Sequence, residues 1–116
     1  MRALGIHHVS INVNDTAAAV DFYTQVLGFT ERADRPDFPF AGAWLDIGDQ
    51  QVHLLEIDMP EAKGQHFALW VADLDGAVAD IRAKGVSVSD PKRVGTGKQA
   101  FLHDPSGNLV ELNQPG

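Results

Sequence analysis

Four side chains able to bind a metal ion recur at one spacing. The interval in residue number from His8 to His66 is the same as the interval from His53 to Glu111. The chain has no cysteine, so a thiolate zinc site, a disulfide framework and a cysteine nucleophile are all excluded. Imidazole and carboxylate groups together suit a divalent ion such as Zn, Ni, Co, Mn or Fe(II). We therefore predict a metal site formed by His8, His53, His66 and Glu111.

Glu111 is the only carboxylate among these four residues. It is therefore the candidate catalytic residue, which would leave the metal ion and carry a proton to and from the substrate. The alternative, that Glu111 is only a metal ligand, is weighed equally. His7 and His103 have no partner at this spacing and are interpreted as structural.

The same interval relates whole segments of the chain, and we call it the repeat interval. Residues 8–15, His-Val-Ser-Ile-Asn-Val-Asn-Asp, align with residues 66–73, His-Phe-Ala-Leu-Trp-Val-Ala-Asp. A polar segment containing proline and glycine, residues 58–65, separates the two copies. A repeat this short favours two units that share one core. We predict a single domain over residues 1–116, with repeat units at about 5–58 and 64–114.

Hydrophobic periodicity and turn residues predict the same elements in each unit. In the first, we expect a strand at 6–13, a helix at 16–27 capped by Asp15, and strands at 29–33, 43–47 and 51–57. In the second, we expect a strand at 66–72, a helix at 74–84 capped by Asp73, and strands at 86–89, 99–103 and 109–113. Each unit is therefore βαβββ.

The alternation along these strands places the candidate ligands opposite the apolar residues. His8, His66 and Glu111 each lie on the polar face of a strand, whereas His53 shares its face with Leu55 and Ile57. If the helices cover the apolar faces, the ligands lie on the other side of the sheet. We predict an α+β fold in which two tandem βαβββ units form a curved mixed sheet, a cup with the helices on its outer face.

Several other residues are candidates for contact with a small-molecule substrate. The aromatic candidates would line the cup, although core packing is an alternative for the two tryptophans: Phe38, Phe40, Trp44 and Trp70. Arg93 and Lys98 flank a segment with two glycines, Gly95-Thr96-Gly97, that could close on an anionic group. Solvated charge is the alternative for these two cations.

Composition excludes several classes of protein. The net charge of −7 argues against nonspecific binding of nucleic acid, which requires an excess of lysine and arginine. No segment has the ~18 consecutive apolar residues of a membrane span, so we expect no membrane association and a cytoplasmic location.

Four segments of the chain resemble the vicinal oxygen chelate superfamily: residues 8–15, 22–29, 66–69 and 104–112. This superfamily includes glyoxalase I, methylmalonyl-CoA epimerase, fosfomycin-resistance thiol transferases, extradiol dioxygenases and bleomycin-binding proteins. The resemblance implies metal ligands on the first and last strands of each unit, which match the four residues above. It also implies a homodimer, with each site built within one chain or across two swapped chains.

One ligand position differs from the pattern of the family. The resemblance implies Glu at this position in glyoxalase I and Gln in the epimerase, whereas this chain has His53. The nearby Glu56 falls on the opposite face of a regular strand, and a bulge would bring it inside.

The resemblance implies a metal-dependent lyase or isomerase of the glyoxalase type, acting on a small oxygenated or thiol-conjugated substrate. The enzymatic alternatives are a thiol transferase and a ring-cleaving dioxygenase. The non-enzymatic alternative is a dimer that sequesters a drug or metabolite.

Overall fold

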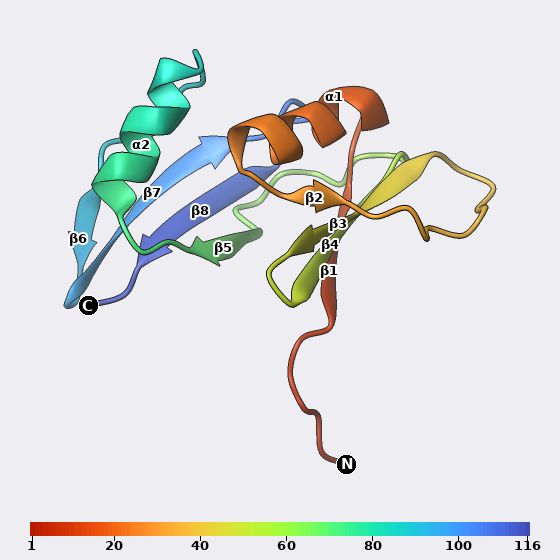
Figure 1. Cartoon of the computed structure of the whole chain (residues 1–116), viewed down its shortest axis with the longest axis horizontal. Coiled ribbons are helices and arrows are strands. Elements are labelled where there is room, and N and C mark those ends of the chain that lie inside the picture. The colour runs from red at the N-terminus through yellow and green to blue at the C-terminus, as the bar shows by residue number, and fades with distance from the viewer. The chain divides into compact units, whose positions relative to one another are not determined.

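The computed structural model describes all 116 residues and divides them into two compact units, Met1–Glu61 and Ala62–Gly116. Each unit combines one four-stranded mixed sheet with one helical segment (Figure 1). The prediction of an α+β fold built from two tandem units is confirmed. The boundary between the units falls within the polar segment 58–65.

The first unit begins with β1 (His8–Asn12), and its helical segment is α1 (Thr16–Asp21) followed by η1 (Phe22–Val26). Its other strands are β2 (Thr30–Glu31), β3 (Gly42–Ile47) and β4 (Gln50–Leu55). The helix predicted at 16–27 is therefore present, but its second half is wound as a π-helix, in which the Leu27 N–H donates to the Phe22 carbonyl at 3.3 Å. Phe22 and Tyr23 are both buried although they are adjacent.

The second unit contains β5 (His66–Trp70), α2 (Leu74–Ala83), β6 (Lys92–Val94), β7 (Gly97–His103) and β8 (Leu109–Gln114). The strand predicted at 86–89 is wrong, because the short edge strand is β6. The Val88 carbonyl accepts from the Arg82 guanidinium at 2.9 Å. Ser89 bonds to β7 through its N–H, which donates to the Phe101 carbonyl at 2.9 Å, and through its hydroxyl, which accepts the Phe101 N–H at 2.8 Å in place of a backbone carbonyl. A ladder along β7 therefore forms only from Lys92 onward.

The first and last strands of each unit lie side by side. The strand orders are β1-β4-β3-β2 and β5-β8-β7-β6, and the central pairs β1–β4 and β5–β8 are parallel. Ser10 is opposite His53 in one sheet, and Ala68 is opposite Glu111 in the other. In both sheets the candidate ligands are therefore diagonal neighbours on one face.

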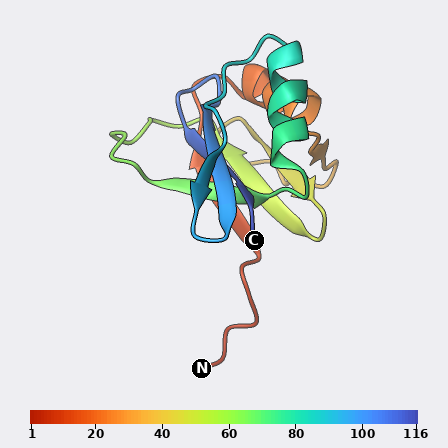
Figure 2. The same ribbon diagram turned by 90° about the vertical axis from the view of Figure 1, so that its left-hand side faces the viewer.

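The opposite face of each sheet is apolar and packs against a helix, as alternation predicts. The buried apolar residues of the first unit are Val13, Ala19, Phe22, Tyr23, Phe29, Ala43, Leu45, Val52 and Leu54. Those of the second unit are Leu69, Leu74, Val78, Ile81, Val88, Ala100, Leu102, Val110 and Leu112. Figure 2 shows α2 lying along its own sheet. We call the other side of each sheet its open face.

Both helices begin with the same two contacts. The carboxylate of Asp15 accepts the Ala18 N–H, and that of Asp73 accepts the Gly76 N–H, each at 3.1 Å, so both predicted N-caps are confirmed. At each helix a second side chain also accepts a backbone N–H. In the first unit it belongs to the residue just after β4, and in the second to the last residue of β8. Glu56 accepts the Thr16 N–H at 2.8 Å.

In the second unit, Gln114 accepts the Leu74 N–H, also at 2.8 Å. Gln114 follows Glu56 by the repeat interval, so the repeat extends to this contact. Glu56 is therefore bound to the helix terminus, and no bulge turns it toward the open face.

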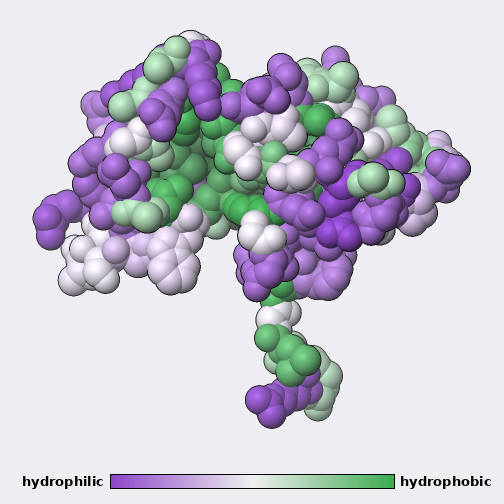
Figure 3. All heavy atoms as spheres, in the orientation of Figure 1, coloured by the Kyte–Doolittle hydropathy of each residue, from purple (hydrophilic) through white to green (hydrophobic).

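Residues 1–7 form an extended arm before β1, which projects with apolar surface along it (Figure 3). Its side chains Met1, Leu4 and Ile6 are exposed. No helix in the chain has both the length and the apolar character needed to cross a membrane.

Candidate functional site

The first pair of candidate ligands, His8 on β1 and His53 on β4, is stacked face to face. The two ring centroids are 4.0 Å apart with an interplanar angle of 16°. Trp44 on β3 stacks on the other side of His53 at 4.3 Å and 9°. His53 is held between two rings and is only 7% exposed, which fixes the plane of its imidazole.

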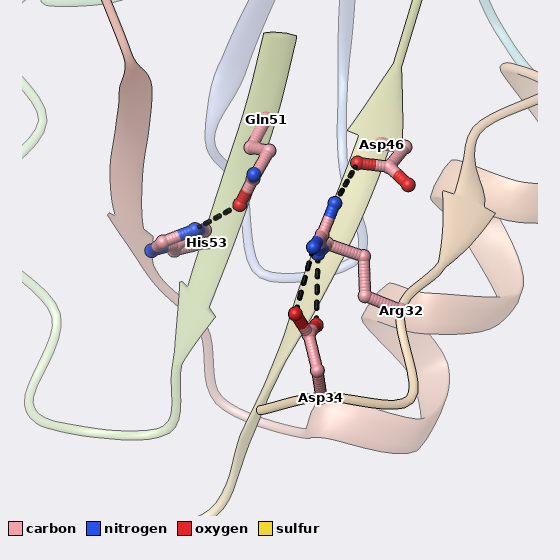
Figure 4. A network of polar contacts seen from close by, with 5 residues as sticks. All are labelled: Arg32, Asp34, Asp46, Gln51 and His53. Atoms are coloured by element: carbon pink, nitrogen blue, oxygen red, sulfur yellow. Dashed lines mark hydrogen bonds and ion pairs between the residues drawn. The ribbon is translucent and has the colours of Figure 1, made fainter. Parts of the chain in front are cut away.

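The nitrogens of the first pair are bound to neighbouring side chains. The Nε2–H of His53 donates to Oε1 of Gln51 at 2.8 Å (Figure 4), and Nδ1 of His7 lies 2.9 Å from Nδ1 of His8. Burial, followed by the nearby charges of His8, His7 and Arg32, lowers the pKa of His53. The neutral form of His53 is therefore favoured, and Gln51 must turn away before Nε2 can bind a metal ion.

Arg32 is a residue of this face that the sequence reasoning missed. Its guanidinium bridges Asp34 at 2.7 Å and Asp46 at 2.9 Å, beside Gln51 and His53 (Figure 4). The hydrogen bond to Asp34, then that to Asp46, raises the pKa of Arg32. Arg32 lies just beyond β2, a strand too short to establish alternation, so no sequence signal placed it here.

The second pair, His66 on β5 and Glu111 on β8, is in direct contact. Nε2 of His66 lies 3.0 Å from Oε1 of Glu111, and Nδ1 of His66 donates to the Gly64 carbonyl at 2.8 Å. The amide of Asn113 donates to Oε2 of Glu111 at 2.8 Å. The hydrogen bond to Gly64, followed by that to Glu111, raises the pKa of His66.

This arrangement turns two electron-pair donors toward one another. Because Nδ1 of His66 carries the hydrogen given to Gly64, a neutral imidazole presents only a lone pair to the carboxylate of Glu111. Two facing acceptors require a cation between them, either a proton or a metal ion. In octahedral coordination, ligand bonds of about 2.1 Å at about 90° place two donor atoms about 3.0 Å apart, so the spacing of the second pair is compatible with an octahedral divalent ion.

The two pairs differ in their fit to a metal ion. The rings of the first pair are nearly parallel, so their nitrogens do not converge until at least one ring turns. Neither unit by itself gathers three or more histidine or carboxylate side chains around one point. The complete set of His8, His53, His66 and Glu111 therefore stays a prediction.

The aromatic candidates of the first unit lie together. Phe38 stacks on Phe40 at 5.5 Å and lies 6.3 Å from Trp44. The guanidinium of Arg35, which the sequence reasoning missed, lies over both phenylalanine rings, at 5.0 Å and 5.6 Å. A continuous series of rings thus runs from Phe40 through Trp44 to the first pair.

In the second unit the candidates lie on different faces. Trp70 is 83% exposed and lies on the open face with His66. Lys98 pairs with Asp75 of α2 at 2.8 Å, on the helix side of the sheet, and Arg93 is opposite Lys98 in the ladder. We therefore leave Arg93 and Lys98 out of the proposed site.

Phe101 on β7 is a further open-face residue that the sequence reasoning missed. It is opposite Glu111 in the ladder and makes an edge contact with His66 at 5.6 Å. It corresponds in position to Trp44, which is opposite His53, although the interval between them is one short of the repeat interval. The longer β7–β8 connection shifts the register by one position, which a fixed spacing does not reveal.

Comparison with known proteins identifies relatives along nearly the whole chain. Residues 5–112 match the family model of the Glyoxalase/Bleomycin resistance protein/Dioxygenase superfamily. A lactoylglutathione lyase of Arabidopsis thaliana is 30% identical over 94% of this chain, which spans 44% of that protein. A probable lactoylglutathione lyase of Vibrio cholerae is also 30% identical, over 94% of this chain and 89% of its own length.

Among solved structures, the antibiotic-binding protein TnmS3 from Streptomyces sp. CB03234 superposes with a TM-score of 0.84. It is 30% identical to this chain, and the match covers 100% of this chain and 99% of TnmS3.

Proposed function

Because this chain belongs to the glyoxalase/bleomycin resistance protein/dioxygenase superfamily, we propose that it is a divalent-metal-dependent lyase or isomerase of the glyoxalase type. Its ligands are His8, His53, His66 and Glu111, and its substrate is a small oxygenated or thiol-conjugated molecule. The observation that carries the proposal is the 3.0 Å contact between Nε2 of His66 and Oε1 of Glu111, with both outer atoms hydrogen-bonded.

A divalent ion bound by these residues would act as a Lewis acid toward neighbouring oxygens of the substrate. The residues of the chain supply orientation and proton transfer. Glu111 is the only carboxylate of the set, so it takes the proton from the carbon beside a carbonyl group and returns it to the adjacent carbon. Gly64 binds Nδ1 of His66, so Nε2 would stay directed at the metal ion while Glu111 moves.

His53 contributes a neutral ligand in place of a second carboxylate. Its lowered pKa keeps the lone pair of the imidazole available near neutral pH, once Gln51 releases Nε2. A neutral ligand leaves more positive charge on the metal ion than a carboxylate would. The site therefore favours a substrate whose oxygens become anionic during the reaction.

Metal binding is the first test of this function. Purified protein is stripped with a chelator, reconstituted with Zn, Ni, Co, Mn or Fe(II), and analysed for metal content. We expect about one ion per chain in the wild type. His66→Ala should lose this ion, whereas His103→Ala, which removes an exposed histidine at the end of β7, should keep it. Less than about one-tenth equivalent in the reconstituted wild type would exclude the proposal.

The reaction is tested on the reconstituted protein. Three substrates separate the lyase, isomerase and ring-cleaving reactions: the hemithioacetal of methylglyoxal, an epimerisable acyl thioester and a catechol. We expect turnover of the hemithioacetal or of the thioester, and loss of turnover in Glu111→Gln. Cleavage of the catechol alone would show that the protein is a dioxygenase instead.

A second candidate is noncatalytic binding of a small molecule, as TnmS3 binds an antibiotic. The series of rings from Phe40 to His53, with His53 already bonded to Gln51, favours it. This candidate requires ligand binding that is unchanged by metal removal and absence of turnover in the metal-loaded protein.

We also propose that the protein is a homodimer. Light scattering after size-exclusion chromatography gives the mass directly, and a monomer mass of 12.5 kDa at micromolar concentration would exclude the dimer.

A further inference from the structure

Both members of the second pair make a hydrogen bond that leads away from the pair. Oε2 of Glu111 accepts from the Asn113 amide at 2.8 Å, and Nδ1 of His66 donates to the Gly64 carbonyl at 2.8 Å. The atoms left over, Oε1 and Nε2, are those that face each other at 3.0 Å. Each of these two outer hydrogen bonds therefore determines which atom of Glu111 or His66 faces the other member of the pair.

Asn113 selects the oxygen of Glu111. It lies two residues beyond Glu111 on β8, so the alternation of the strand places both side chains on the open face. A glutamate side chain has three rotatable bonds, and a carboxylate with two free oxygens can turn. With Oε2 bound to Asn113, only Oε1 remains directed at His66.

Gly64 selects the nitrogen of His66. Its φ of +92° lies in the region that favours glycine, and it lies two residues before His66. The bond from Nδ1 to its carbonyl prevents the ring from flipping, which leaves Nε2 as the inward nitrogen. Metal-binding histidines commonly bind a backbone carbonyl through their second nitrogen in this way.

The first unit has neither contact at the equivalent positions, although Gln51 binds His53 from the other side along β4. The residue that precedes Asn113 by the repeat interval is Leu55, whose side chain has no donor, and the one that precedes Gly64 by the same interval is Ile6. Nδ1 of His8 instead lies against His7. The outer contacts therefore belong to the second pair alone and do not follow from the repeat.

From these contacts we propose that Asn113 and Gly64 are positioning residues, which preset the second pair to bind the metal ion through Oε1 of Glu111 and Nε2 of His66. The inference rests on the proposed function, since it concerns the same metal ion. Loss of one such outer contact lowers metal affinity about 10- to 100-fold in comparable sites.

The test is a Co²⁺ titration of the metal-free protein in competition with a chelator, followed by visible absorption. We expect Asn113→Ala and Asn113→Leu to weaken Co²⁺ binding about 10- to 100-fold and to change the absorption bands that report the ligand geometry. Gly64→Ala should weaken binding in the same direction, because a residue with a Cβ disfavours the positive φ that directs the carbonyl.

Gln99→Ala is the matched control, because Gln99 lies opposite Asn113 in the ladder and no contact joins it to Glu111. It should bind Co²⁺ as the wild type does. If the wild type binds Co²⁺ and both Asn113 variants stay within about twofold of it, or if Gln99→Ala weakens binding equally, the inference is wrong and the proposed function stands. If the wild type binds no Co²⁺ or other divalent ion, the proposed function itself fails.

Discussion

The imidazoles of His53 and His66 lie at the open faces of two equivalent sheets in opposite surroundings. His53 is buried between two rings and lies near His8, His7 and Arg32, so its pKa is lowered. His66 faces a carbonyl and a carboxylate, so its pKa is raised. The neutral form of His53 and the protonated form of His66 are therefore both favoured by folding in the absence of metal.

This difference predicts two opposite effects of pH on stability. A lowered pKa means that the contribution of His53 is complete above the ordinary histidine pKa of 6.5 and is lost as pH falls through its folded-state pKa. A raised pKa means that the contribution of His66 is complete below 6.5 and is lost as pH rises through its folded-state pKa. In the metal-free protein the two contributions should therefore be present together only between the two folded-state pKa values.

An NMR titration of the histidine ring protons in the metal-free protein measures the two pKa values. We expect His66 to titrate at higher pH than His53. In Glu111→Gln the pKa of His66 should fall but should stay raised in part, because the Gly64 carbonyl remains. The opposite order of titration would contradict the assigned contacts.

At the scale of elements, the start of α1 accounts for the role of Glu56, which the sequence alone left undecided. Glu56 could have been a second carboxylate of the site if a bulge turned it, but its side chain binds the backbone at the start of α1. Gln114 does the same for α2. Glu56 and Gln114, at equivalent positions, thus cap the helices and are not part of the proposed metal site.

We predict that Glu56→Ala destabilises the protein by about 1 kcal/mol, because the Thr16 N–H loses its acceptor and the helix terminus loses a favourable negative charge. Glu56→Gln, which keeps the acceptor oxygen as Gln114 does, should cost less. Urea unfolding measures both changes. Metal content should be unchanged in both variants, and its loss in Glu56→Gln would show that Glu56 belongs to the site.

At the scale of the whole molecule, each unit is small for an independent domain. A chain of about 60 residues buries only about 60% of the surface that it exposes when unfolded, so its stability is marginal. We predict that residues 1–61 and residues 62–116, each expressed alone, show no cooperative thermal transition by circular dichroism, whereas the full chain does. A sharp transition in either half would show that the unit folds independently.

The sequence by itself determined the repeat, both helix caps, the apolar face of each sheet and the strands that carry the candidate ligands. These follow from local rules, because periodicity and capping depend on residues within one or two turns of each other. The strand at 86–89 was predicted wrongly because side chains replace its ladder bonds: Arg82 binds the Val88 carbonyl, and the Ser89 hydroxyl accepts the Phe101 N–H. The π-helical turn after Asp21 likewise had no local signal.

Only the tertiary structure decided what surrounds the ligands. The parallel pairing of first and last strands brings His8 to His53 and His66 to Glu111. The neighbours of each pair then make the two pairs unlike: rings stacked across strands and Gln51 surround the first pair, and Gly64 and Asn113 hold the second. The repeat interval shows that the pairs are equivalent in position. It cannot show their environments, because the stacking of rings depends on strand register and the local contacts of Gln51, Gly64 and Asn113 depend on side-chain and backbone conformation.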